Sequence, residues 1–301
     1  MDDDVLTRLT AVEDLPALPT VVSSVLEMVD DGQSSLGELA TVIQQDAAIS
    51  AALVKMANSA FYGSRFSVSN VSQALSLIGL SATIPLVVGL SLRGLQESFN
   101  SSINFEHYWR RSVLSGSVSA WLCRFTDIKK EDALLAGLVQ DIGLLAASAT
   151  YQEQYRQCDI STWHDHCALS SLEEKLFGFD HTLISATLLK NWGFPHRTVT
   201  AVELSHTEPN LLERDLTWCV TGSNLISNAI MRGLDSGRLV EEIKEVMDSY
   251  WLPIAPDDYD TRLFECLERI SELEQLFEVR LLPNDMEAIL NKYKETLNGT
   301  A

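Results

Sequence analysis

Asp141 and two histidines are the residues whose types and positions suggest chemistry. Asp141 lies in an otherwise apolar run, 134–145, which predicts a buried helix. A buried carboxylate is costly unless a cation, a hydrogen bond or a metal ion compensates it. His181 is at a predicted helix start and His206 is near a predicted helix end. Because imidazole and carboxylate suit divalent ions, the three side chains are candidate metal ligands. The alternative for Asp141 is a structural ion pair or a helix-capping hydrogen bond. The alternative for each histidine is a capping or packing role.

A denser cluster, Trp163-His164-Asp165-His166-Cys167, has ligand-type residues at a short spacing in a predicted loop. A structural metal site needs about four well-placed ligands. We therefore expect this segment to be a cluster on the surface.

Other kinds of active site are absent from the sequence. There is no glycine-rich phosphate loop of either common type and no Gly-x-Ser-x-Gly turn, which excludes P-loop nucleotide hydrolysis and the serine hydrolases built on that turn. The five cysteines are odd in number, and no two have the C-x-x-C spacing. Neither a disulfide framework nor a thiolate zinc site is indicated, and a reducing compartment is expected.

The charge of the chain limits its partners. With 42 acidic and 22 basic residues the net charge is −20, which disfavours a nucleic-acid partner, because phosphate contacts are made by Lys and Arg. Of the four blocks 1–50, 51–130, 131–240 and 241–301, only 51–130 has a net positive charge, with eight Lys and Arg against three Asp and Glu. That block predicts either an ordinary solvated surface or local binding of a small anionic ligand or an acidic partner.

The elements that must position these residues are predicted to be helices throughout. Only 15 Gly and 8 Pro occur in 301 residues, and apolar residues recur at helical spacing behind capping residues such as Ser35. A polar stretch, 94–106, predicts a module boundary. The expected division is an N-terminal helical module, a second helical module and an acidic helical C-terminal extension, over residues 1–100, 101–233 and 234–301. Helices of the second module are expected at about 107–125, 131–149, 169–177, 181–192, 196–206 and 215–232.

No membrane partner is expected. The charge-free stretch between Arg65 and Arg93 is long enough to cross a bilayer, but it contains Pro85 and many polar residues, so buried helices are predicted instead. The start, Met1-Asp2-Asp3-Asp4, has no basic or apolar region typical of a secretory signal. We therefore expect a cytoplasmic protein.

Several motifs, in this order along the chain, together resemble one family. The chain is similar to bacterial HDOD-domain proteins, which are degenerate relatives of the HD and HD-GYP metal-dependent phosphohydrolases. The resemblance runs from about residue 15 to 230 and implies an HD-like fold for the second module. Its motifs are Leu15-Pro16-x-Leu18-Pro19, Ala47-x-Ile49-Ser50, Asn58-Ser59-Ala60-Phe61-Tyr62-Gly63, Trp109-Arg110-Arg111-Ser112, Gly137-Leu138-Val139-Gln140-Asp141-Ile142-Gly143, Phe177-Gly178-Phe179-Asp180-His181 and Trp192-Gly193-Phe194-Pro195.

The resemblance also implies that the metal pocket of the family is degenerate here. Active HD enzymes hold their metal with an early His, a His-Asp pair and a late Asp. Of these four positions only Asp141 keeps a ligand; His181 and His206 match the positions of further His ligands in the HD-GYP relatives. The implied pocket consists of Arg111, Gln140, Asp141, His181, His206 and Asn224.

Loss of the ligands predicts a function without catalysis. Arginine carries a permanent charge and has no lone pair for a metal, so Arg111 is expected to pair with Asp141 where a metal would lie. The resemblance implies a regulatory or signal-transduction protein without a cofactor, acting through a protein partner or a small anionic ligand. The alternative is a residual phosphohydrolase, acting on phosphomonoesters or cyclic dinucleotides, with a divalent metal on Asp141, His181 and His206.

Overall fold

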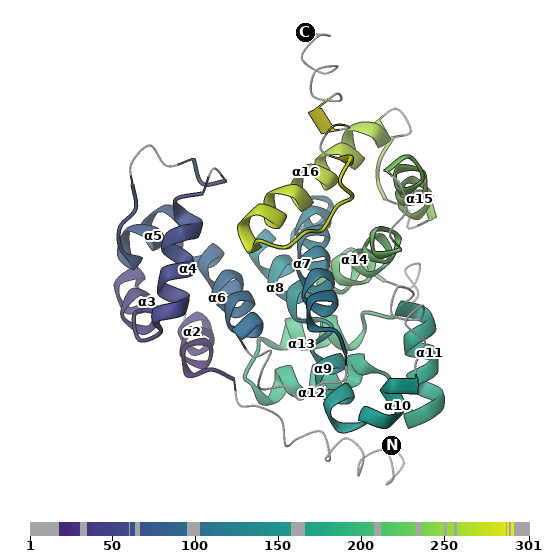
Figure 1. Ribbon diagram of the computed structural model, residues 1–301, viewed down its shortest axis with the longest axis horizontal. Helices are drawn as coiled ribbons and strands as arrows, with labels where there is room; N and C mark the ends of the chain where they lie inside the picture. Colours follow the sequence, from purple (N-terminus) through teal and green to yellow (C-terminus); the bar gives the residue numbers. More distant parts are fainter. Residues whose placement is uncertain are drawn as a thin grey trace.

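The structure is a computed structural model in which the described residues form an assembly of helices (Figure 1). No strand occurs in the described part of the chain, so the predicted all-α class is confirmed. The described residues are 18–30, 35–59, 61–63, 67–94, 103–157, 166–207, 212–232, 236–249, 252–255, 258–286, 288 and 290–291.

The N-terminal helices begin at the predicted caps. Ser35 and Glu38 form the predicted capping box, with the Ser35 amide donating to Glu38 Oε2 over 2.8 Å. Asn70 caps the fourth of these helices, and Gly79 at a φ of 89° ends it, a conformation that favours glycine. The helices are α2 (Thr20–Asp30), α3 (Leu36–Ile43), α4 (Ala47–Ala57), α5 (Val71–Ile78) and α6 (Leu80–Gly94).

Two apolar segments bear on membrane crossing. The charge-free stretch forms α5 and α6, which meet at an angle of 118°. The segment Lys130–Thr150 is long and apolar enough to cross a membrane, and 89% of its apolar window is buried inside the protein. Burial of that extent is what a core helix of a folded protein shows.

The second module is built around α7 (Phe105–Leu122), which packs against α8 (Lys130–Val139) and α14 (Leu216–Met231). The backbones of α7 and α8 lie unusually close. A Cβ on Gly137 would be 2.6 Å from the carbonyl oxygen of Ser115 and 2.8 Å from Gly116 Cα. Only glycine permits this approach, which brings α8 and the residues that follow it up against α7.

The predicted helix 131–149 is wrong in one respect, because the chain turns at Gln140 and Asp141 and then begins α9 (Ile142–Thr150). The amide of Gly143 donates to Ser185 Oγ, on a distant helix, over 2.8 Å. A tertiary hydrogen bond of this kind leaves no trace in the apolar periodicity. The turn places Asp141 at the junction of several helices.

The remaining helices of the second module close one end of it. They are α10 (Gln152–Gln157), which was not predicted, α11 (His166–Phe177), which begins three residues earlier than predicted, α12 (His181–Asn191) and α13 (His196–Glu203).

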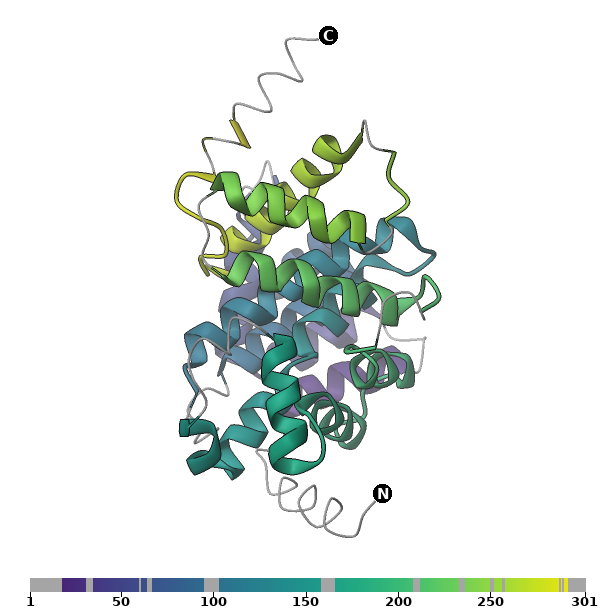
Figure 2. The same ribbon diagram turned by 90° about the vertical axis from the view of Figure 1, so that its right-hand side faces the viewer.

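The C-terminal helices pack onto the second module rather than extending from it. Figure 2 shows α15 (Ser236–Ser249) lying along α14. Helix α16 (Tyr259–Phe277) crosses α7, where the rings of Trp109 and Phe277 meet edge to face with centroids 5.6 Å apart. Arg93 of α6 donates to the Phe277 carbonyl over 2.9 Å, so α16 touches both modules. The division at residues 100 and 233 stays a prediction, since residues 95–102 and 233–235 lie outside the described part.

Candidate functional site

Arg111 and Asp141 form the ion pair that the sequence predicts, and both side chains are almost completely buried. Arg111 Nε donates to Asp141 Oδ2 over 2.7 Å. The other two guanidinium nitrogens donate to side-chain oxygens on α14, Nη2 to Asn224 over 3.0 Å and Nη1 to Asn228 over 2.8 Å. The guanidinium therefore joins α7, the 140–141 turn and α14. We call Arg111, Asp141, Asn224 and Asn228 the arginine cluster.

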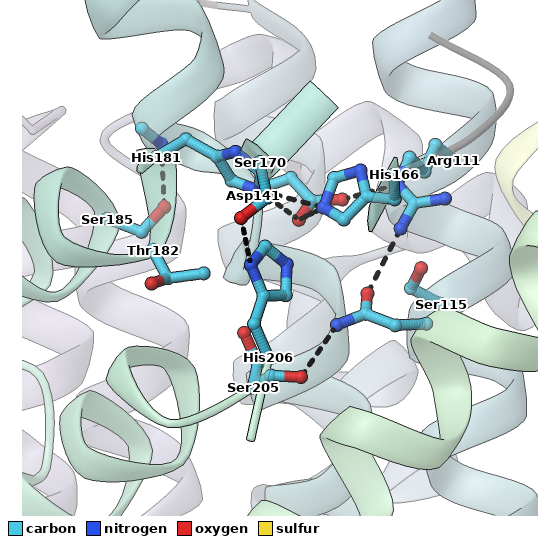
Figure 3. A network of polar contacts seen from close by, with 12 residues as sticks. Arg111, Ser115, Asp141, His166, Ser170, His181, Thr182, Ser185, Ser205 and His206 are labelled. Carbon is cyan, nitrogen blue, oxygen red and sulfur yellow. Dashed lines mark hydrogen bonds and ion pairs between the residues drawn. The ribbon is translucent and has the colours of Figure 1, made fainter. Parts of the chain in front are cut away.

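Asn228 is not among the site residues predicted from the sequence, although its spacing from Asn224 indicates it. It lies four residues after Asn224 on α14, so the two amides share one helix face. Asn224 also donates from Nδ2 to the carbonyl of Ser205 over 3.2 Å, which ties α14 to the segment after α13 (Figure 3). The side-chain oxygen of Asn224, a predicted pocket residue, thus accepts a hydrogen bond from Arg111 instead of being free for a metal ion.

His166 is buried beside Asp141, so the expectation of a surface cluster at 163–167 is wrong for this residue. It is 2% exposed, and its Nε2 lies 3.1 Å from Asp141 Oδ1. Residues 163–165 lie outside the described part of the chain. The signal was helical spacing: His166, Ser170 and Glu173 recur at i, i+4 and i+7 and make one buried face of α11.

The three histidines of the site converge on one another, and we call His166, His181 and His206 the histidine cluster (Figure 3). Their ligand-type nitrogens lie within 4.8 Å of one another. His181 Nε2 lies 2.7 Å from His166 Nε2 and 3.7 Å from Asp141 Oδ1. Of the predicted ligands, the structure brings His181 and His206 together and adds His166, which was expected to belong to a surface cluster.

Carboxylates stand behind two of the three imidazoles. His181 Nδ1 lies 2.5 Å from Glu173 Oε2, which also accepts from the His181 amide over 3.0 Å. Tyr155 donates its hydroxyl to the other oxygen of Glu173. His206 Nδ1 lies 2.6 Å from Oδ2 of Asp180, the residue that caps α12. A carboxylate at Nδ1 orients an imidazole so that Nε2 is presented for coordination, which is the arrangement seen around metal-ligating histidines.

The electrostatics of the site follow from burial and pairing. Burial alone would raise the pKa of Asp141, but its interactions with His166 and with the Arg111 guanidinium outweigh burial and hold that pKa well below its ordinary value. Burial and the Arg111 charge lower the pKa of His166. Burial opposes the charged form of His181 as well, but Glu173 outweighs it and raises the pKa of His181 to about 9. At neutral pH, Asp141 is therefore ionised, His166 is neutral and His181 is protonated.

Gln140 is the predicted pocket residue whose side chain makes no hydrogen bond to any described residue. It is completely buried, and neither amide atom has a hydrogen-bond partner among the described residues. An amide is a poor replacement for an imidazole ligand. Gln140 therefore contributes to neither the arginine cluster nor the histidine cluster through any hydrogen bond in the described part.

The arrangement has two chemical capacities. The arginine cluster is a permanent buried ion pair that connects three segments of the module. The histidine cluster fits a divalent ion, because three imidazoles converge and two of them have a carboxylate at Nδ1; three protein ligands with an open position suffice in hydrolytic zinc sites.

Known structures share this fold. An HDOD domain protein of unknown function from Geobacter sulfurreducens has a TM-score of 0.68 at 19% identity, covering 90% of this chain and 99% of that one. A Shewanella amazonensis SB2B protein provisionally named a phosphohydrolase has a TM-score of 0.67 at 18% identity, covering 91% and 97%. A Marinobacter aquaeolei VT8 protein provisionally named a signal transduction protein has a TM-score of 0.61 at 18% identity, covering 91% and 67%. Identities this low establish the fold alone.

Comparisons of sequence give the family. An uncharacterized protein of Treponema pallidum (strain Nichols) is 22% identical over 144 residues, which are 47% of this chain and 28% of that relative. This chain thus matches less than a third of the length of that curated relative. The family model of the HDOD domain matches residues 15–208. Because that match covers more than half of the chain and the fold agrees with it, the protein belongs to the HDOD family.

Proposed function

We propose that this protein is a regulatory protein of a signalling pathway that acts by binding and not by hydrolysis. Membership of the HDOD family and the similarity in fold to the Marinobacter protein support the regulatory role. The ion pair of Arg111 with Asp141 is the main observation against hydrolysis. A protein partner is the proposed target, and a cytoplasmic location is proposed with it.

The ion pair argues against hydrolysis for two reasons. Asp141 Oδ2 is engaged by Arg111, so one oxygen of the single retained HD-type carboxylate is already occupied. A guanidinium a few ångströms from a dication is repelled by several kcal/mol even at an effective dielectric near 20. The Arg111 side chain is held in place by Asn224 and Asn228, so it cannot leave the site without losing two further hydrogen bonds.

A second candidate function is supported by the histidine cluster. A divalent ion held by His166, His181 and His206 would act, when bound, as a Lewis acid or a structural cross-link. Glu173 and Asp180 would orient two of the imidazoles, as they do in this structure. The sequence-based set of Asp141, His181 and His206 is thereby revised to include His166. Metal-dependent phosphohydrolysis is the enzymatic form of this candidate.

Metal content and hydrolysis separate the two candidates. We expect protein purified without chelator to contain well below one metal ion per chain by elemental mass spectrometry. We also expect no turnover of a phosphomonoester or a cyclic dinucleotide with added Mn²⁺ or Zn²⁺, because Arg111 occupies the pocket. Replacing Arg111→His together with Gln140→His should raise metal affinity, since two imidazoles would replace a cation and an amide.

Matched histidine variants control that measurement. His181→Ala removes a member of the histidine cluster, whereas His196→Ala removes an exposed histidine at the start of α13. One metal ion per chain that is lost in His181→Ala and kept in His196→Ala would contradict the metal-free prediction and establish the second candidate. Hydrolysis by the metal-loaded protein that disappears in Asp141→Ala would refute the proposal of binding without hydrolysis.

A further inference from the structure

A cleft separate from the arginine cluster is lined by two arginines and a histidine that the proposed function does not use. It lies between the first turns of α7 and the segment after α16, and its volume is about 580 Å³. A volume of this size is in the range of small-molecule sites. Its polar lining is Asn104, Glu106, His107, Arg110, Arg280 and Asn284.

Arg110 and Arg280 differ from most arginines of this acidic chain. In the described part, six arginines form ion pairs across the surface or along a helix, and neither Arg110 nor Arg280 forms an ion pair with a carboxylate. The six are Arg124, Arg156, Arg197, Arg232, Arg262 and Arg269. In a protein of net charge −20, two arginines without a carboxylate partner give this cleft a local positive charge, which favours the binding of an anion.

Arg110 is held in the cleft in a way that leaves a donor free. Its Nη2 donates to the Leu281 carbonyl over 2.9 Å, which fixes the guanidinium against the segment that carries Arg280. Its Nε is buried and has no hydrogen-bond partner among the residues that the structure describes. Burial lowers the pKa of Arg110, and the neighbouring Arg280 lowers it further, while Glu274 opposes both. An anion bound between Arg110 and Arg280 would relieve the repulsion between the two guanidinium groups.

We propose that this cleft binds the phosphate group of a small ligand. Two guanidinium groups match the oxygens of a phosphate, His107 lines the same cleft, and Asn104 and Asn284 can donate further hydrogen bonds. Two carboxylates are close. Glu106 is exposed at the cleft, and Glu274 Oε1 already accepts from the Leu281 amide over 2.8 Å. The site is independent of the proposal that Arg111 prevents hydrolysis.

Calorimetric titration of the full chain with pyrophosphate and with inorganic phosphate tests this site. Arg280 is exposed, so Arg280→Gln should fold normally, and it should weaken pyrophosphate binding about tenfold or more, because a charge-assisted hydrogen bond is lost. Arg110→Lys keeps the charge but loses the forked geometry, and should weaken binding as well. Arg214→Gln, with the same change of charge at an exposed position outside the cleft, should stay within twofold of the unmodified protein.

Three results would overturn the phosphate assignment. The first is the absence of saturable heat with both phosphate compounds. The second is an affinity of Arg280→Gln equal to that of Arg214→Gln. The third is citrate binding at least as tightly as pyrophosphate at matched ionic strength, which would assign the cleft to carboxylates. Thermal unfolding of each variant shows whether the fold is retained, and the result for Arg280→Gln stands even if Arg110→Lys unfolds.

Discussion

Replacing Arg111 with alanine should lower the free energy of unfolding by about 3–5 kcal/mol, because it leaves the Asp141 carboxylate buried without its cation. Arg111 is 3% exposed and Asp141 is 1% exposed, so bulk water solvates the carboxylate poorly once the guanidinium is removed. The variant also removes the donors to Asn224 and Asn228, whose buried side-chain oxygens accept from Arg111. Urea denaturation followed by circular dichroism measures the loss.

The double variant Arg111→Met with Asp141→Leu is the matched control. It removes both charges and keeps a similar volume, so its cost should be clearly below that of Arg111→Ala. The cost does not vanish, since His166 loses the carboxylate oxygen 3.1 Å from its Nε2. If the single and the double variant are destabilised equally, the ion pair is not the reason that Arg111 is needed.

Replacing Gly143 with alanine should lower the free energy of unfolding by about 3 kcal/mol or more, because the added methyl group would meet backbone atoms. A Cβ at this position would be 2.2 Å from the His181 carbonyl oxygen and 2.6 Å from the Ser185 amide nitrogen. Backbone cannot rotate away as a side chain can, so α9 and α12 must move apart. The movement would also break the bond from the Gly143 amide to Ser185 Oγ and shift His181 within the histidine cluster.

Gly37→Ala is the control for this substitution. Gly37 lies in α3, and an added Cβ there has no neighbour nearer than 3.8 Å. Alanine is the better helix former, so this variant should be neutral or more stable by up to about 1 kcal/mol. Thermal unfolding of both variants checks the pair. A Gly143→Ala protein as stable as Gly37→Ala would contradict the close approach of α9 and α12.

Local features of the fold follow from the sequence, because they depend on neighbours within a few residues. The capping box of Ser35 and Glu38 and the glycine end of α5 are examples. Helix spacing also predicts most helices to within a few residues. The pairing of Arg111 with Asp141 was predicted as well, but from the resemblance to a family and from the cost of a buried charge, since 30 residues separate the two along the chain.

Which helix faces meet is decided only by the tertiary structure. His166 was assigned to a surface loop, yet α11 turns it toward Asp141 and places Glu173 behind His181. At the break between α8 and α9 the Gly143 amide donates to Ser185 Oγ on α12, and Arg110 donates to the carbonyl of Leu281, 171 residues later. Periodicity determines which side of a helix is apolar and therefore buried. It does not determine the partner of that side, because the partner is selected by packing and by the pairing of polar groups across the whole chain.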